Sequence, residues 1–166
     1  MSPNPRHATP SILIVEDEPK MRRLLELNLG EQGYGVRAAS DAEAGLNIIR
    51  QEKVDLVLTD LKLPGIDGLE FLQMVKRTNA TIPVVVMTAY GTVETAVEAM
   101  KAGAADYVLK PFSLEEIQLV IRKELDVHRL REENLSLREA LGRRYEFKTL
   151  WRAARRCRKS CPLSSV

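Results

Sequence analysis

Five short apolar runs alternate along the chain with amphipathic segments of helical length, and this alternation restricts the fold more than any other feature. Four of the runs are rich in β-branched residues with little polar alternation, which is typical of parallel strands covered on both faces. The runs span 12–15, 36–39, 54–58, 83–87 and 107–109. The amphipathic segments lie at about 20–32, 42–52, 68–78 and 93–102, and a fifth begins at Ser113. The pattern predicts repeated βαβ units and a doubly wound α/β sheet with helices on both faces.

Composition limits the class of protein. Hydrophobic residues make up 45% and charged residues 29% of the 166 positions, as in a folded, water-soluble domain. No apolar run approaches the roughly 20 residues that span a bilayer. The first ten residues, MSPNPRHATP, lack the apolar stretch of a signal peptide and are predicted to be a disordered leader (1–10). We therefore expect a cytoplasmic protein with no membrane association.

Polar residues stand where four of the predicted strands end. Glu16 and Asp17 follow the first strand, Asp60 the third, Thr88 the fourth and Lys110 the fifth. In a parallel sheet these ends meet at one rim, and ligands bind beyond it. We therefore expect carboxylates, a hydroxyl and an ammonium in one pocket.

Clustered carboxylates repel one another and call for a cation. Hard oxygen ligands with few protein contacts suit Mg²⁺. We predict that Asp17 and Asp60 bind the metal directly, and Glu16 directly or through water. The main-chain carbonyl of Lys62 is a plausible third ligand.

A carboxylate next to Mg²⁺ and a lysine can accept a phosphoryl group as an aspartyl phosphate. The metal and Lys110 would spread the charge on the transferring oxygens, and Thr88 would supply a hydroxyl to one of them. In VLTDLKLPGIDG (57–68) the acceptor Asp60 ends a strand, and Pro64-Gly65 stiffens the following turn. A single aspartate after a strand is more often a helix cap or turn former. The combination of four such strand ends is what favours a phosphoacceptor.

The chain closely resembles the receiver domain of bacterial two-component response regulators. The resemblance covers residues 11–125 and is carried by ILIVEDE, LVLTDLKLPGIDGLEFL, VVVMTAYG and AGAADYVLKPF. It implies a flavodoxin-like (CheY-like) five-stranded sheet of order 2-1-3-4-5. It also implies phosphorylation of Asp60 by a sensor histidine kinase, with Asp17 and Asp60 binding Mg²⁺. Glu16 occupies a position where the family more often has aspartate.

The same resemblance assigns roles to residues around the acceptor. Thr88 and Lys110 match the family's hydroxyl and lysine, and Lys110-Pro111 matches its cis peptide. Tyr107 matches an aromatic switch that rotates when Thr88 moves towards the phosphoryl group. Spacing alone favours a half-buried strand aromatic at this position.

The segment TAYGTVETAVEAMKAGAADYVLKPF is particularly similar to the NtrC-like group, which activates sigma-54-dependent transcription. In that group an ATPase domain and a DNA-binding domain follow the receiver, and this chain is too short to include them. We therefore expect a signalling domain that assists transfer to its own aspartate, rather than an enzyme with an external substrate. No direct nucleic-acid binding is expected.

Three other functions can be weighed against the residues. A haloacid-dehalogenase-like phosphatase would carry Asp-x-Asp, but Leu61 and Lys62 follow Asp60. A flavin-binding domain would have a Ser-, Thr- and Gly-rich loop after the first strand, where the acidic EDE would repel a phosphate. A pseudo-receiver that signals only by protein contacts stays as the alternative, although the set of Asp17, Asp60, Thr88 and Lys110 is intact.

The fifth helix is predicted to run past the receiver. Ser113 and Glu116 have capping-box spacing, and no Gly or Pro follows until Gly142. Residues 126–142 fit a coiled-coil linker, and a single Asn at an a position favours a parallel dimer. We expect a homodimer through helix five and the linker. The predicted seam residues are Val120, Val127, Leu130, Asn134, Leu137 and Leu141. A solvated helix extension is the simpler alternative.

Residues 143–166 form a basic tail with a charge of +7, against −5 for residues 1–142. We expect this tail to be disordered. One set of codons for WRAARRCRKSCP reads VARSPAMQEILP in another frame, similar to the start of the ATPase domain in related regulators. This suggests a frameshifted end or one introduced by cloning. Cys157 and Cys161 lack companion ligands for zinc, and no folded DNA-binding pattern accompanies the basic residues.

Overall fold

The computed structural model describes residues 9–89 and 91–157, with side chains described as far as residue 139. In this part of the chain, strands and helices alternate throughout, as the sequence predicts. The elements are β1 (Ser11–Val15), α1 (Pro19–Glu31), β2 (Gly35–Ala39), α2 (Ala42–Gln51), β3 (Leu56–Asp60), α3 (Gly68–Thr78), β4 (Val84–Thr88), α4 (Val93–Lys101), β5 (Asp106–Leu109) and α5 (Leu114–Cys157).

The strands form one parallel sheet in the order β2-β1-β3-β4-β5. The central strands β3 and β4 are buried along their whole length, which explains their continuous apolar sequence. The edge strand β2 is mostly half-buried and has the weakest apolar signal. The predicted CheY-like topology is therefore confirmed.

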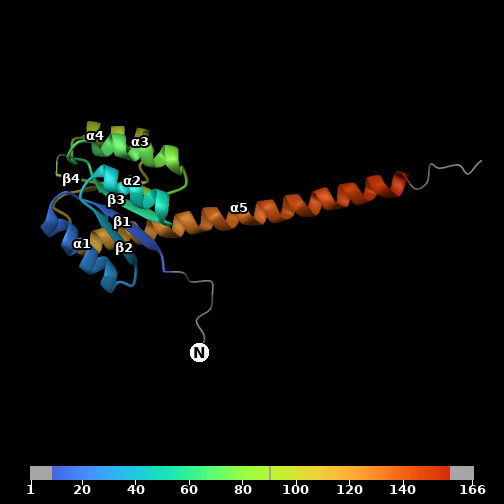
Figure 1. Cartoon of the computed structure of the whole chain (residues 1–166), viewed down its shortest axis with the longest axis horizontal. Coiled ribbons are helices and arrows are strands. Elements are labelled where there is room, and N and C mark those ends of the chain that lie inside the picture. Colours follow the sequence, from blue (N-terminus) through green and yellow to red (C-terminus); the bar gives the residue numbers. More distant parts are fainter. Residues whose placement is uncertain (1–8, 90, 158–166) are drawn as a thin grey trace, which may run out of the picture. The chain divides into compact units, whose positions relative to one another are not determined.

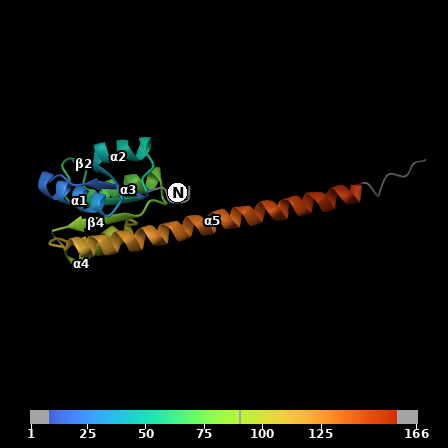
Figure 2. The same cartoon turned by 90° about the horizontal axis from the view of Figure 1, so that it is seen from below.

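Helices cover both faces of the sheet (Figure 1). Successive strand residues point to opposite faces, so each strand contributes to two hydrophobic clusters. Leu13 and Val15 pack in the cluster under α2, α3 and α4, whereas Ile12 and Ile14 pack in the cluster under α1 and the start of α5. Helices α2 and α3 lie side by side on their face in both views (Figures 1 and 2).

Side chains cap the starts of several helices, and the predicted cap at Ser113 is one of them. Asp67 accepts a hydrogen bond from the Leu69 amide and begins α3, and Thr92 and Thr95 form a capping box that begins α4. At the start of α5, the Ser113 hydroxyl accepts a hydrogen bond from the Glu116 amide at 3.1 Å. These caps determine the residues at which α3, α4 and α5 begin.

Helix α5 extends further than expected. It continues through Gly142 to Cys157, whereas the sequence predicts a helix that ends near Gly142 and disorder from residue 143. One glycine costs a helix only about 1 kcal/mol relative to alanine, and the flanking residues are mostly strong helix formers. Residues 1–8 and 158–166, which include most of the predicted leader (1–10) and the end of the basic tail, lie outside the described residues.

The described residues divide into two compact units between His128 and Arg129. The boundary lies close to residue 125, where the predicted receiver ends. Within the first unit, Val120 packs partly against the cluster under α1 and α5. In the second unit, Leu130, Leu135 and Leu137 expose more than half of their surface. No described helix has both the length and the apolar content to cross a bilayer.

Gly68 allows α3 to begin directly against the backbone that carries Asp60. A Cβ at this position would overlap the Asp60 carbonyl oxygen and would lie 2.6 Å from the Leu61 Cα, and neither backbone atom can move cheaply. We expect Gly68→Ala to lower the free energy of unfolding by about 2 kcal/mol, as overpacking does.

Gly30→Ala is the matched control, because nothing lies within 4 Å of a Cβ built on this helical glycine. Urea unfolding should leave the control unchanged or slightly stabilised. Equal losses in the two variants would contradict the steric role of Gly68.

Candidate functional site

The site lies at the rim where β1, β3, β4 and β5 end. Glu16 and Asp17 follow β1, Asp60 is the last residue of β3, and Thr88 is the last residue of β4. Lys110 directly follows β5, and its amide donates to the Thr88 carbonyl at 2.8 Å. The structure therefore brings all the predicted strand-end residues to the same edge of the sheet.

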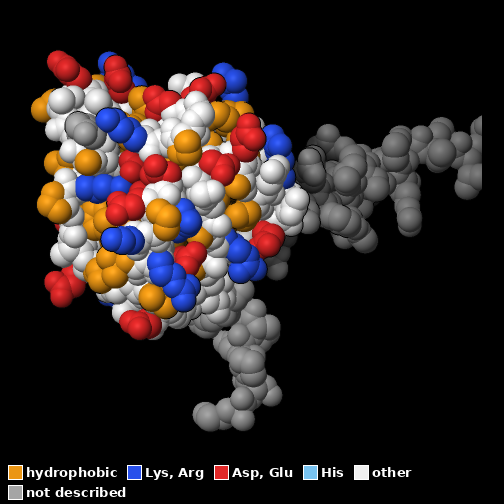
Figure 3. Space-filling view, turned by 60° about the vertical axis from the view of Figure 1, so that its left-hand side comes forward, with side chains coloured by type: hydrophobic (Ala, Val, Ile, Leu, Met, Phe, Trp, Pro, Cys, Tyr) orange, Lys and Arg blue, Asp and Glu red, His pale blue; other side chains and the backbone are white. Residues whose placement is uncertain are grey.

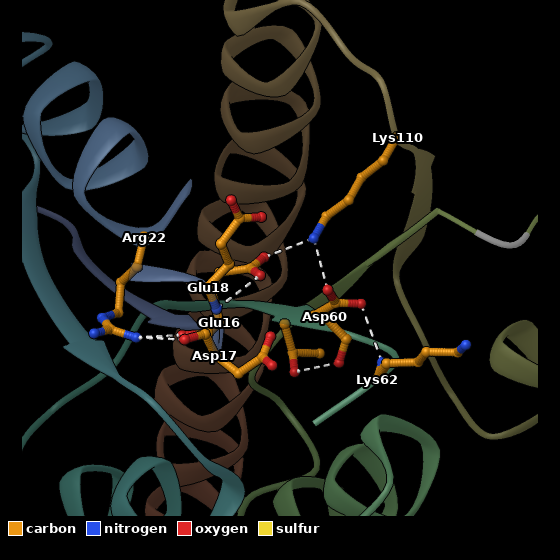
Figure 4. Close-up of polar contacts among 8 residues, drawn as sticks. Glu16, Asp17, Glu18, Arg22, Asp60, Lys62 and Lys110 are labelled. Carbon is orange, nitrogen blue, oxygen red and sulfur yellow. Dashed lines mark hydrogen bonds and ion pairs between the residues drawn. The ribbon is translucent and has the colours of Figure 1, made fainter. Parts of the chain in front are cut away.

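The Lys110 ammonium joins two of the carboxylates (Figure 4). Its Nζ lies 2.6 Å from Asp60 Oδ2 and 2.8 Å from Glu16 Oε2. Glu16 is 1% exposed and the Lys110 side chain 14% exposed, so these ion pairs are largely shielded from water. Glu16 also accepts the Glu18 amide at 3.4 Å.

Burial and pairing shift two pKa values in this cluster. Desolvation raises the pKa of Glu16 above its ordinary 4.5, and the hydrogen bond from Lys110 only partly offsets this. Desolvation lowers the pKa of Lys110, but hydrogen bonds to Asp60 and Glu16 together outweigh it and raise the pKa above 10.5. Because the folded state holds this proton more tightly, the charged lysine stabilises the fold below about pH 10.5 and does so less as the pH rises further.

Three carboxylates lie close enough to share a cation. One oxygen from each of Glu16, Asp17 and Asp60 lies within 4.8 Å of the other two. Hard carboxylate oxygens are the donors that Mg²⁺ prefers, and a single ammonium does not balance three acidic groups. The donor set therefore fits the predicted magnesium site.

The main chain around Asp60 fixes the direction of its carboxylate. The Lys62 amide donates to Asp60 Oδ1 at 3.1 Å, and the Leu61 amide donates to the Met87 carbonyl of β4 at 2.9 Å. In the turn that follows, Gly65 has a φ of +82°, a conformation that glycine adopts readily. The role of the Lys62 carbonyl as a metal ligand stays a prediction.

Tyr107 lies partly buried against the cluster under α2, α3 and α4. Among the described residues, its buried hydroxyl has no hydrogen-bond partner. Gly91, which the sequence analysis did not single out, allows this packing, because a Cβ there would overlap both the Tyr107 hydroxyl and the Leu109 side chain. The Lys110-Pro111 peptide is cis, as the family resemblance implies.

Arg22 is a second residue that the sequence analysis missed. Its guanidinium donates to the main-chain carbonyl of Glu16 at 2.7 Å and to that of Asp17 at 3.3 Å. The only sequence signal is an arginine in the first turns of the helix after the acidic loop. That signal is weak because Arg23 beside it has no such contacts, and pairs with Glu26 instead.

The sheet order and the lysine–carboxylate cluster at its rim define a doubly wound α/β domain of the CheY-like class. The family model of the response regulator receiver domain matches residues 12–122, which is most of the described sequence. The chain therefore belongs to the response regulator receiver family.

The relatives belong to the NtrC-like group. The chain is 37% identical over 136 residues to the regulatory protein AtoC of Escherichia coli, covering 82% of this chain and 30% of that protein. It is 38% identical over 130 residues to the nitrogen assimilation regulatory protein NtrX of Azorhizobium caulinodans, covering 77% of this chain and 29% of that protein. The chain thus spans less than a third of the length of these relatives.

Solved structures agree with this assignment. NtrX from Brucella abortus superposes with a TM-score of 0.74 at 35% identity, over 78% of this chain and 30% of that one. A CheY-like receiver domain protein from Methanospirillum hungatei superposes with a TM-score of 0.72 at 30% identity, over 75% of this chain and 99% of that one.

Lys110→Met tests the ion pairs at the rim. Removing the ammonium leaves the buried Glu16 carboxylate without its main partner, so we expect a loss of about 3 kcal/mol in the free energy of unfolding at neutral pH. The loss should shrink as the pH falls through the raised pKa of Glu16, because protonation removes the unpaired charge.

Arg37→Met is the control, because Arg37 pairs with Glu52 at 2.6 Å but the two side chains are 52% and 45% exposed. This variant should lose less than about 1 kcal/mol. Denaturant unfolding at several pH values compares the two, and similar losses without a pH dependence would contradict the buried pairing.

Proposed function

We propose that this domain accepts a phosphoryl group on Asp60 from a sensor histidine kinase and thereby regulates a transcription activator. The main support is the contact of Lys110 with Asp60 at 2.6 Å, beside two further carboxylates that can share a cation. Family membership supports the same role. A cytoplasmic location, expected from the sequence, belongs to this proposal.

The residues at the rim would have separate roles in phosphoryl transfer. Asp17 and Asp60, with Glu16 directly or through water and the Lys62 carbonyl, would hold Mg²⁺, which supplies positive charge to the phosphoryl oxygens. Lys110 adds a second positive charge from the end of β5. Thr88, 1% exposed at the end of β4, offers a hydroxyl to a phosphoryl oxygen.

The transfer moves one phosphoryl group from histidine to aspartate and takes one proton from solvent. An oxygen of the Asp60 carboxylate attacks phosphorus and forms an O–P bond as the P–N bond to the donor histidine breaks. The leaving imidazole takes up a proton from solvent. The hydrogen bond of the Lys62 amide to Asp60 Oδ1 keeps the carboxylate in one orientation while the other oxygen, Oδ2, faces Lys110.

The signal would leave the site through Thr88 and Tyr107. Movement of Thr88 towards the phosphoryl group would change the packing beside Tyr107, whose hydroxyl is buried without a hydrogen bond among the described residues. Burying an unsatisfied hydroxyl costs about 1–3 kcal/mol, so a second position of the ring is energetically accessible. The α4, β5 and α5 surface would change its contacts as a result.

The output assigned to the domain is control of sigma-54-dependent transcription by ATPase and DNA-binding domains that lie outside this chain. The domain itself would be a phosphoacceptor without external turnover, and it would not bind nucleic acid directly. A pseudo-receiver that works by protein contacts alone is the alternative. The intact set of Asp17, Asp60, Thr88 and Lys110 favours the phosphoacceptor.

Phosphorylation is tested by incubation with acetyl phosphate and Mg²⁺, followed by intact mass spectrometry. The wild-type chain should gain the mass of one phosphoryl group, and Asp60→Asn should gain none. Asp67→Asn is the matched control from the same turn, because asparagine also caps helices well and α3 should stay intact. A mass gain that persists in Asp60→Asn would rule out this acceptor.

Dimerisation through helix five and the linker is a second part of the proposal. Leu130 and Leu137 are 60% and 64% exposed, and they occupy d positions of the predicted seam. Leu130→Lys with Leu137→Lys should shift sedimentation towards the monomer, because charges would face each other in the seam.

Leu135→Lys is the control for surface charge. Leu135 is 54% exposed but occupies a b position, outside the seam. Sedimentation of this variant should match the wild type. A wild-type chain that is monomeric before and after phosphorylation would exclude the homodimer.

A further inference from the structure

Arg22 bonds to three consecutive carbonyls of the acidic loop, residues 16–18. Its guanidinium Nη1 donates to the carbonyls of Glu16 and Asp17 at 2.7 and 3.3 Å. Its own main-chain amide donates to the Glu18 carbonyl at 3.0 Å. One half-buried residue in the first turns of α1 therefore holds the main chain of the whole loop.

The loop needs such a restraint because it belongs to no strand or helix. At the N-terminal end of the loop, the Glu16 amide donates a hydrogen bond to the Ala39 carbonyl at 3.1 Å. The loop carries the carboxylates of Glu16 and Asp17, which have oxygens within 4.8 Å of an Asp60 oxygen, and these carboxylates repel one another. Without a restraint, this repulsion would favour positions of the loop in which the carboxylates lie further apart.

Arg22 and Lys110 act on different parts of the loop, and they lie on opposite sides of it (Figure 4). Lys110 contacts Oε2 of Glu16 and Oδ2 of Asp60, which are among the oxygens available to a metal. The guanidinium of Arg22 instead bonds main-chain carbonyls. Arg22 can therefore keep its contacts while the carboxylates bind a cation.

We propose that Arg22 is a positioning residue that holds the acidic loop in the arrangement required for Mg²⁺ binding. This inference rests on the proposed function of the site. The positive charge of Arg22 by itself opposes metal binding, whereas the hydrogen bonds favour it by holding the ligands in place. Partners that orient metal ligands typically change metal affinity by about 10–100-fold when they are removed, so the positioning effect is the larger one.

The test is a titration of the full chain with Mg²⁺. Binding is measured by calorimetry and by the amide NMR shifts of residues 16–18. Arg22→Gln should weaken binding about tenfold. Arg22→Lys keeps a positive donor and should recover most of the affinity. Arg23→Gln removes the same charge from the neighbouring position, whose side chain is 68% exposed and pairs with Glu26, and should bind like the wild type.

A positioning role and a purely electrostatic role of Arg22 predict opposite changes in Mg²⁺ affinity when Arg22 is replaced by Gln. A purely electrostatic role would make Arg22→Gln bind Mg²⁺ more tightly, and a purely structural role elsewhere would leave binding equal to that of Arg23→Gln. Either result would overturn the proposal. Protection of the Leu58 amide in β3, measured in the same samples, shows whether a variant has kept its core.

Amide hydrogen exchange separates this inference from the proposed function. If the wild-type chain binds no Mg²⁺, the metal site of the proposed function is wrong. The restraint by Arg22 still predicts faster exchange of the Asp17 and Glu18 amides in Arg22→Gln than in Arg23→Gln. Equal exchange rates in these two variants would refute the restraint whatever the metal result.

Discussion

The rim of this domain depends on one ammonium shared by two carboxylates. Lys110 lies 2.8 Å from Glu16 and 2.6 Å from Asp60, although these acids are far away in the sequence and belong to different strand ends. The pairing lets acidic groups remain close together with little contact with water. In the function we propose, that closeness prepares Asp60 to accept a phosphoryl group, and the three carboxylates of the cluster could together hold a divalent cation.

The fold makes this arrangement possible through the main chain as much as through side chains. The parallel sheet brings four strand ends to one edge, and the absence of a side chain at Gly68 lets α3 begin against the carbonyl of Asp60. On the other side, Arg22 holds the carbonyls of the acidic loop. These two contacts position the main chain that carries the carboxylates without occupying the carboxylate oxygens.

The sequence predicted the sheet and the strand-end residues that gather at its rim, because both depend on local patterns. β-Branched runs mark the strands, and parallel strands necessarily end together. The roles of Arg22 and Gly91 were not predictable in this way, since each depends on main-chain or side-chain atoms brought close by the tertiary fold. The end of α5 was also misjudged, because one glycine is a weak helix breaker and Gly142 lies within the helix. Partial burial of Val120 against its own domain was likewise invisible in the heptad pattern.

Direct identification of the phosphorylated residue tests the central claim most sharply. The chain is phosphorylated with phosphoramidate and Mg²⁺, reduced with borohydride, which converts an aspartyl phosphate to homoserine, and digested for peptide mass spectrometry. The account predicts homoserine at position 60, in the segment VLTDLK. Homoserine at Asp17 or Asp67, or at no position in a chain that has gained a phosphoryl group, would contradict it.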